Sequence, residues 1–315
     1  MLIATDSDVT RAVLAEAARA PDARTREILT AGIRHLHGFV RDAKLTENEF
    51  RHLCTVIARL GQLTNEAHNE VMLAAGSLGV SALVCLLNNG GGVEQTTANL
   101  MGPFWREGSP HLANGASIVR SPTPGLPVFV DAWVHDAEGR PLAGARVDVW
   151  HASPEGFYEN QDPSQASMNL RGTFTTDALG HIGFRTVKPA GYPVPVSGPV
   201  GDLLRAQGRH NLRPAHLHFM IHKPGYKTQF SQVYSSDDPN LETDSQFGVT
   251  QALVAHYVLH DSASEPAPAA DVSGAWYSLE RRFVVQHGDA ALPTPPISGK
   301  VEGTRPQLAV LPRRN

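Results

Sequence analysis

Hydrophobic positions in the first ninety residues recur at steps of three to five, the spacing that places apolar side chains on one face of a helix. The clearest series consists of Ile28, Leu29, Ile33, Leu36 and Val40. Residues 46–49 (Thr-Glu-Asn-Glu) form a capping-box pattern that opens a second amphipathic segment. A third apolar segment, residues 71–87, is interrupted by Gly76 and Gly79. The pattern predicts a helical N-terminal third that ends at a loop over residues 88–92.

After about residue 120 the pattern changes to short alternating segments separated by turns. These segments are residues 128–134, 145–150, 182–186, 217–221 and 276–286. Several short strands with regular turn signals indicate an antiparallel β-sandwich. We therefore predict a mainly β protein with an α-helical N-terminal region. Its parts would be a helical domain over residues 1–100, a β-sandwich domain over 101–290 and a C-terminal tail over 291–315.

Composition narrows the function classes. The chain of 315 residues is 41% hydrophobic and 18% charged, and its net charge of −4 gives no reason to expect nucleic-acid binding. Cys54 and Cys85 lie in apolar, helix-like contexts and are interpreted as reduced core thiols. Residues 1–8 lack the pattern of a signal peptide, and no apolar run reaches membrane-spanning length. We expect a cytoplasmic protein with no membrane partner.

The segment 213–219 (Arg-Pro-Ala-His-Leu-His-Phe) carries candidate metal ligands. On a strand, the imidazoles of His216 and His218 point to the same face and can hold one ion, although such a pair alone is more typical of ordinary packing. Tyr158 and Tyr192 stand upstream in turn-rich segments. Two phenolates and two imidazoles suit ferric iron better than zinc or ferrous iron.

With these residues the chain resembles the intradiol ring-cleavage dioxygenases of the catechol and hydroxyquinol group. The resemblance runs from the helical third to the histidines and covers nearly the whole chain. Its motifs are residues 102–105 (Gly-Pro-Phe-Trp), 144–152 (Gly-Ala-Arg-Val-Asp-Val-Trp-His-Ala), 169–172 (Asn-Leu-Arg-Gly) and 208–210 (Gly-Arg-His). The resemblance implies one non-haem Fe(III) per chain. The implied ligands are Tyr158, Tyr192, His216 and His218.

The resemblance also implies a reaction. Ferric iron would draw electron density from a bound catecholate, so that O2 opens the ring between two adjacent hydroxyls and gives a muconate- or maleylacetate-type product. Tyr192 is implied as the ligand that substrate displaces, and Tyr158 as the permanent one. Arg213 would stabilise charge that builds on the ring, and Gln232 would assist O–O cleavage and acyl migration.

The helical third is expected to cover the iron and to help line the substrate ring. By motif context the lining residues are Leu73, Gly76, Leu100, Pro103, Phe104, Val194 and Pro195. Residues 192–195 (Tyr-Pro-Val-Pro) and 198–201 (Gly-Pro-Val-Gly) are more similar to hydroxyquinol enzymes, so hydroxyquinol is the first expected substrate, with catechol or a substituted catechol as the alternative. Hydroxyquinol enzymes often carry an Asp where this chain has Gly76. The glycine predicts a modest preference and room for a larger ring substituent.

Two other interpretations account for part of the sequence. A non-catalytic β-sandwich binding module explains the turn residues but not Tyr158, Arg213 and the two histidines together. A zinc hydrolase built on the histidine pair would retain zinc and be indifferent to Tyr158→Phe.

The apolar face of the helical third predicts a protein partner. The resemblance implies a homodimer formed through these N-terminal helices, and a phospholipid bound between them.

Overall fold

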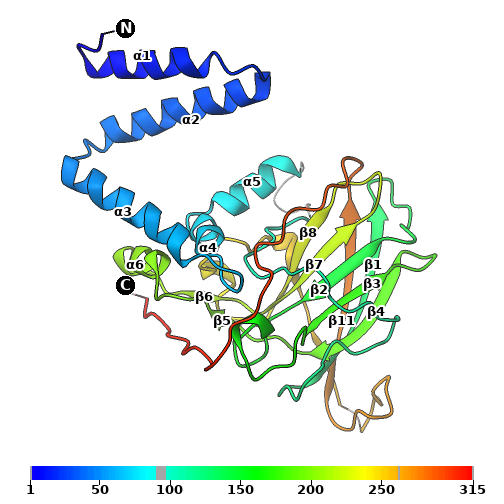
Figure 1. Ribbon diagram of the computed structural model, residues 1–315. Helices are drawn as coiled ribbons and strands as arrows, with labels where there is room; N and C mark the ends of the chain where they lie inside the picture. The colour runs from blue at the N-terminus through cyan, green and yellow to red at the C-terminus, as the bar shows by residue number, and fades with distance from the viewer. Residues whose placement is uncertain (1, 90–96, 262, 314–315) are drawn as a thin grey trace. The chain divides into compact units, whose positions relative to one another are not determined.

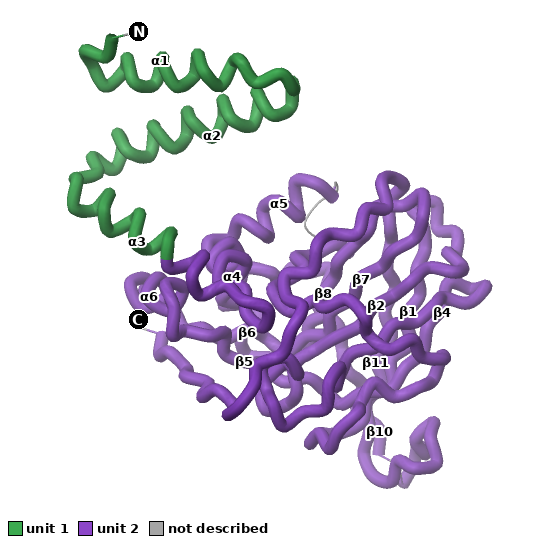
Figure 2. The backbone as a smooth tube through the Cα atoms, in the orientation of Figure 1, with its two compact units in different colours: residues 1–58 green, residues 59–315 purple. Residues whose placement is uncertain are grey.

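The computed structural model describes residues 2–89, 97–261 and 263–313 (Figure 1). The chain divides into two compact units, residues 1–58 and 59–315, coloured separately in Figure 2. Compactness therefore groups the helices after residue 58 with the β-strands. The predicted domain limits at residues 100 and 290 rest on changes in the hydrophobic pattern along the sequence and stay predictions.

The helices of the described N-terminal residues follow the predicted pattern. They are α1 (Asp6–Ala17), α2 (Ala23–Asp42), α3 (Glu47–Leu63), α4 (Glu70–Ser77) and α5 (Val80–Asn88), and α6 (Pro199–Ala206) comes later in the chain. The capping box before α3 is confirmed, because Oγ1 of Thr46 accepts a hydrogen bond from the N–H of Glu49 and Oε2 of Glu49 accepts one from the N–H of Thr46. The break between α4 and α5 falls at Gly79, which has a positive φ of 73°.

The strands belong mainly to two sheets. They are β1 (Pro127–Asp136), β2 (Arg146–Trp150), β3 (Arg171–Thr175), β4 (His181–Val187), β5 (Tyr192–Pro193), β6 (Leu212–Arg213), β7 (His216–His222), β8 (Gln229–Ser235), β9 (Val254–Ala255), β10 (Val258–His260) and β11 (Trp276–Val285). Within the described residues, short 3₁₀ helices cover Glu159–Gln161, Leu241–Thr243 and Gln251–Leu253.

The two large sheets form the predicted sandwich. One has the strand order β10-β11-β1-β4 and the other β3-β2-β7-β8-β9, and a short β5-β6 pair lies outside both. Two pairs depart from the expected antiparallel arrangement, since β11 runs parallel to β1 and β9 runs parallel to β8. An alternating pattern reports which side chains are buried and carries no information on strand direction.

The core of the sandwich fixes which way β7 faces. Leu217, Phe219 and Ile221 are buried between the sheets, together with residues of β1, β4 and β11. Because side chains alternate along a strand, His216, His218 and Met220 project from the opposite face of the five-stranded sheet. The prediction that the histidines face away from the apolar core is confirmed.

A second apolar cluster covers that outer face. Its members include Leu73 and Ala74 of α4, Val200 and Leu204 of α6, and the side chains of Tyr158, Tyr192, Phe104 and Met220. The histidine face of the sheet is therefore enclosed rather than open to solvent.

Two smaller findings concern the cysteines and the membrane. Cys54 and Cys85 are both free thiols, but Cys54 is exposed and Cys85 is half-buried, so the expectation of core positions is wrong for Cys54. Helix periodicity marks an apolar face without showing what covers it. Among the described residues, no single helix is long and apolar enough to cross a membrane, although the bent pair α4–α5 passes the same test of length and composition.

Candidate metal centre and active site

Strand β7 holds the two histidines in a fixed orientation. The imidazole of His218 stacks on the indole of Trp150, with ring centroids 4.6 Å apart and planes 9° from parallel. Nδ1 of His216 lies 2.7 Å from the carbonyl oxygen of Pro214, and a carbonyl can only accept, so Nδ1 carries the proton. In the neutral ring, Nε2 of His216 then presents a lone pair.

A loop and a short strand bring the tyrosines to the same point. Tyr158 directly precedes the 3₁₀ turn Glu159–Gln161, and its backbone N–H donates to Oε1 of Gln161 at 3.1 Å. Tyr192 lies in β5, where it pairs with Arg213 of β6. Since Arg213 stands only three residues before His216, this pairing carries Tyr192 to the histidine face of β7.

The four predicted ligands converge in a buried cluster. Oη of Tyr158 lies 3.1 Å from Oη of Tyr192, 3.0 Å from Nε2 of His218 and 3.5 Å from Nε2 of His216, and the two Nε2 atoms are 3.0 Å apart. Donor atoms about 2.0–2.2 Å from a common ion lie about 3.0–3.5 Å from one another. Nδ1 of His218 has no hydrogen-bond partner among the described residues, so that ring makes its polar contacts only toward the cluster. The geometry and donor set fit a bound metal ion.

The protonation states of the cluster depend on what lies at its centre. Burial, and then the neighbouring charge of Arg213, lowers the pKa of His216 to about 3, and burial and His216 lower the pKa of His218 well below its usual value. Both imidazoles are therefore neutral, as metal ligands must be. Burial raises the pKa of Tyr158 and of Tyr192, so without a cation both phenols stay protonated. A metal ion would reverse that preference.

Arg213 is placed beside the cluster by a buried network. Its Nη1 lies 3.3 Å from Nε2 of His216, and its Nη2 donates to Oε1 of Gln232 at 2.9 Å and to Oη of Tyr234 at 3.1 Å. Burial disfavours its charge, but the carboxylate of Asp244 raises the pKa of Arg213 overall. Arg213 is consequently a fixed cation at the edge of the four-residue cluster.

Gln232 links this network to the backbone at Leu100. It pairs with His218 across strands β7 and β8, and its Nε2 donates to the carbonyl oxygen of Leu100 at 2.8 Å. The structure thus brings Gln232 next to Arg213 and holds both ends of its amide.

A second buried ion network fixes the loop that carries Tyr158. Oε1 of Glu159 accepts from Nη1 of Arg106 at 2.6 Å and from Nε of Arg171 at 2.9 Å. Arg171 also donates to the carbonyl oxygen of Phe104 at 2.7 Å and to Oδ1 of Asn160 at 3.0 Å. Three segments far apart in sequence are thereby locked together around Tyr158.

Sequence reasoning missed Glu159, Asp244 and Tyr234 as parts of these networks. A buried arginine signals that a carboxylate must lie nearby, yet Asp244 follows Arg213 by 31 residues and no spacing rule connects them. The identity of such partners appears only in three dimensions.

The predicted pocket residues fall into two groups. Leu73, Phe104 and Val194 are buried in the same cluster as the two tyrosines, and Leu100 is buried beside Gln232. Pro103 and Pro195 are half-buried, and Pro195 borders a hollow shared with residues 306–309 of the tail. The part that each residue plays with a substrate stays a prediction.

Gly76 is buried on α4, and the space beside it is already filled. A Cβ atom at this position would collide with Oε1 of Gln246 and lie 3.0 Å from its Cδ. The expectation that Gly76 leaves room for a larger ring substituent is therefore wrong, because the carboxamide of Gln246, 170 residues away in sequence, occupies that room.

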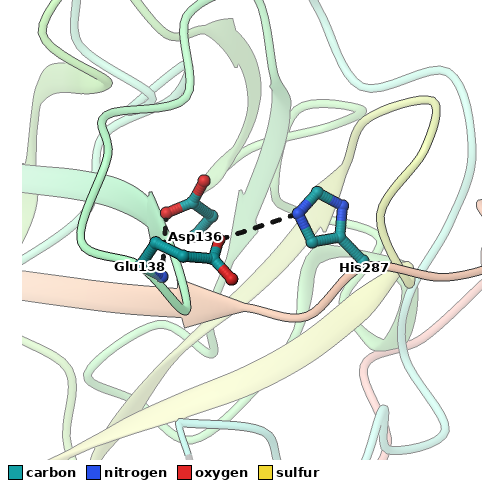
Figure 3. Close-up of side chains that lie close together, drawn as sticks. All are labelled: Asp136, Glu138 and His287. Carbon is teal, nitrogen blue, oxygen red and sulfur yellow. Dashed lines mark hydrogen bonds and ion pairs between the residues drawn. The ribbon is translucent and has the colours of Figure 1, made fainter.

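Another group of potential metal ligands lies elsewhere, at Asp136, Glu138 and His287 (Figure 3). Nε of Arg140 binds Asp136 at 2.7 Å, and Nη2 of Arg140 binds Glu138 at 2.9 Å. Glu138 and His287 are exposed. Because the guanidinium of Arg140 already binds both carboxylates, we assign no metal to this group.

Comparisons with known proteins agree with this geometry. The family model described as dioxygenase matches residues 100–276, and the model described as catechol dioxygenase N terminus matches residues 22–95. The chain is 39% identical to a 6-chlorohydroxyquinol 1,2-dioxygenase of Cupriavidus pinatubonensis, covering 80% of this chain and 91% of that protein. It is 36% identical to a catechol 1,2-dioxygenase of Candida albicans, covering 74% and 78%.

Solved structures give the same result. The fold superposes on hydroxyquinol 1,2-dioxygenase from Pseudomonas putida DLL-E4 with a TM-score of 0.78 and 35% identity, covering 90% of this chain and 99% of that one. The chain belongs to the intradiol ring-cleavage dioxygenase family and is an enzyme.

Proposed function

We propose that this enzyme is a non-haem Fe(III) dioxygenase that opens the ring of hydroxyquinol, or of a related catechol, between two adjacent hydroxyls. The observation that carries the proposal is the convergence of Tyr158, Tyr192, His216 and His218 in one buried cluster of two phenols and two imidazoles. Oxygen-rich anionic donors with imidazoles favour ferric iron. When bound, the iron would supply the electron-withdrawing centre that makes a catecholate reactive toward O2.

Each neighbouring residue has a part that its contacts support. With the iron bound, Tyr192 would be a phenolate whose Oη could take a proton from an incoming hydroxyl, and Tyr158, which contacts the other three residues, would hold the ion. The fixed cation of Arg213 stabilises negative charge on the substrate ring, and preorganised charge of this kind is usually a large catalytic contribution. Gln232 orients Arg213 through its amide oxygen. Leu73, Phe104 and Val194 exclude water from the ring.

The deciding experiment measures metal, colour and oxygen uptake on one preparation. Protein expressed with iron should contain about one iron per chain, absorb visible light through phenolate-to-iron charge transfer, and consume O2 with hydroxyquinol. Retained zinc with no colour would favour a zinc hydrolase, and metal-free, colourless protein would favour a binding module.

Substrate choice is part of the same proposal. The motifs at residues 192–195 and 198–201 favour hydroxyquinol, and two of the similar proteins named above act on a hydroxyquinol. Catechol is the second candidate, since the Candida albicans relative is named for it. Oxygen uptake with hydroxyquinol, catechol, 4-chlorocatechol, 4-methylcatechol and protocatechuate would rank these substrates.

We also propose that the enzyme is a cytoplasmic homodimer formed through its N-terminal helices. No residue of α2 or α3 is buried in the chain. The exposed large apolar side chains are Ile28, Leu29, Leu36, Phe39 and Val40 on α2, and Phe50, Ile57 and Leu63 on α3. A surface this apolar favours a partner. A phospholipid between the helices stays a prediction of the sequence resemblance, and lipid extraction with mass spectrometry would test it.

A further inference from the structure

The carboxamide of Gln246 lies where a side chain at residue 76 would lie. Gly76 is the next-to-last residue of α4, and a Cβ built on it would collide with Oε1 of Gln246 and stand 3.0 Å from Cδ and 3.8 Å from Cβ. Gln246 is 3% exposed, so its amide is an interior group. The chain thus places a polar side chain from another segment at the point where α4 carries none.

Two chain segments connect this amide to the metal centre. Leu73 precedes Gly76 by three residues, hence lies on the same side of α4, and it packs in the cluster that contains Tyr158 and Tyr192. Gln246 follows Asp244 by two residues, and Asp244 binds the guanidinium that touches His216. The amide is therefore linked to the cluster indirectly, through α4 on one side and through Asp244 and Arg213 on the other.

The hydrogen bonds of Gln246 leave its oxygen available. Its backbone N–H donates to Oδ1 of Asp244 at 3.1 Å, and its Nε2 donates to Oγ of Ser77 at 2.8 Å and to the carbonyl oxygen of Ser245 at 3.3 Å. Both amide hydrogens are engaged, and in the part of the chain that the structure describes no donor reaches Oε1. Oε1 is not among the fully buried side-chain atoms that lack a partner, so it keeps some contact with open space and has accepting capacity to spare.

We propose that Gln246 is the specificity-determining residue for the substrate ring, and that its Oε1 accepts a hydrogen bond from the third hydroxyl of hydroxyquinol. The inference rests on the proposed function. Catechol lacks that hydroxyl, so its binding leaves the acceptor unpaired, which is the more costly kind of mismatch. The enzyme therefore prefers hydroxyquinol although α4 has no acidic residue at position 76, and the preference is about tenfold to a hundredfold.

The first test removes the acceptor while keeping the volume. Gln246→Leu should lower the ratio of kcat/KM for hydroxyquinol to that for catechol by about tenfold to a hundredfold. The dissociation constants of both substrates, measured without oxygen by fluorescence titration, should lose the same discrimination. Gln286→Leu is the matched control, since the side chain of this half-buried glutamine after β11 donates to the carbonyl oxygen of Asn89, and its backbone bond to Lys227 survives the substitution. Gln246→Met serves if the leucine variant fails to fold.

The second test exchanges the two positions. In Gly76→Asp/Gln246→Ala, the colliding oxygen and Cδ are gone and the remaining Cβ stands 3.8 Å away, an ordinary contact, so the new carboxylate has room. This double variant should recover a preference for hydroxyquinol that Gln246→Ala alone loses. Gly76→Asp alone should be poorly folded or inactive because Gln246 blocks it.

The possible results distinguish a failure of the role of Gln246 from a failure of the proposed dioxygenase activity. Wild-type protein that cleaves neither substrate overturns the proposed function. Wild-type protein that cleaves both with equal kcat/KM, or a Gln246→Leu variant that keeps the wild-type ratio, overturns the role of Gln246 and leaves the dioxygenase intact. Equal losses on both substrates would assign Gln246 to packing, and a double variant without recovered preference would show that residues 76 and 246 do not share one subsite.

Discussion

Nη2 of Arg213 lies 3.0 Å from Oδ2 of Asp244, and the two side chains form an ion pair that is almost completely buried. The carboxylate also accepts the backbone N–H groups of Gln246 at 3.1 Å and Gly248 at 2.9 Å. One carboxylate therefore holds both the cation beside His216 and the loop that carries Gln246. Asp244 thus links the buried ion pair to the backbone around Gln246.

Removing the charge of Asp244 should destabilise the fold. Asp244→Asn leaves a buried guanidinium without a counter-charge, and breaking such a pair costs about 3–5 kcal/mol. Asp202→Asn is the matched control because its ion pairs with Arg59 and Arg205 are largely exposed and contribute about 1 kcal/mol or less. Urea unfolding at neutral pH gives both free energies. Equal losses in the two variants would contradict the structural role of the buried pair.

The same pair predicts a pH dependence. Burial alone would raise the pKa of Asp244, but the charge and hydrogen bonds of Arg213 lower it below its usual value. A carboxyl with a lowered folded pKa contributes stability that is full above its unfolded pKa, near about 4, and is lost as pH falls through the folded value. The stability difference between wild type and Asp244→Asn should therefore be constant from neutral pH to about pH 5 and shrink below about pH 4. A stability difference that grows on acidification would contradict a lowered pKa of Asp244 in the folded protein.

The two tyrosines should differ in their effect on iron. Oη of Tyr158 contacts the other three members of the cluster, whereas Oη of Tyr192 contacts Tyr158. Tyr158→Phe should therefore lower iron affinity more than Tyr192→Phe does. The loss relative to wild type should exceed about tenfold, because substitution of residues that only surround metal ligands already lowers metal affinity by about that factor. Iron content after gel filtration and the visible absorbance band measure both. Tyr226→Phe, whose ring stacks on His287 away from the cluster, should change neither.

The histidine face illustrates how far sequence reasoning reaches. Period two along residues 216–221 correctly assigned Leu217, Phe219 and Ile221 to the core and the histidines to the other side. A local rule suffices there because neighbouring side chains on a strand must point in opposite directions. The convergence of Tyr158 with the histidines came from resemblance, since loop closure across 58 residues follows no local rule.

The positions that sequence reasoning misjudged depend on long-range packing. Gly76 indicates an empty space by itself, but residue 246 fills that space. The β1–β11 pair is parallel because a segment some 150 residues later returns beside the first strand, and alternation alone is silent on direction. Cys54 lies on an amphipathic helix, and the periodicity does not say whether the same chain or another molecule covers it.

Gly102 should be required for the position of His218. Its φ is 73°, and a Cβ would stand 3.3 Å from Cε1 of His218, whose ring also stacks on Trp150. Gly102→Ala should cost about 1–2 kcal/mol for the backbone conformation and should also weaken iron binding by displacing the imidazole. Gly108→Ala is the control, with a φ of 84° and open space around it. Comparable iron content in the two variants would contradict the idea that a side chain at residue 102 displaces the imidazole of His218.

The exposed face of α2 should govern association of the enzyme. Leu36 is 58% exposed in the single chain, and burying a leucine at an interface contributes about 1.5–3 kcal/mol. Leu36→Glu removes that contribution and places a charge in the interface, so the dimer dissociation constant should rise by at least about tenfold. Leu179→Glu is the matched control, because this leucine is 68% exposed in a turn of the sandwich. Sedimentation equilibrium across nanomolar to micromolar concentrations measures both constants. Wild-type protein that is monomeric at micromolar concentration would refute the interface, and equal weakening by the two substitutions would move it away from α2.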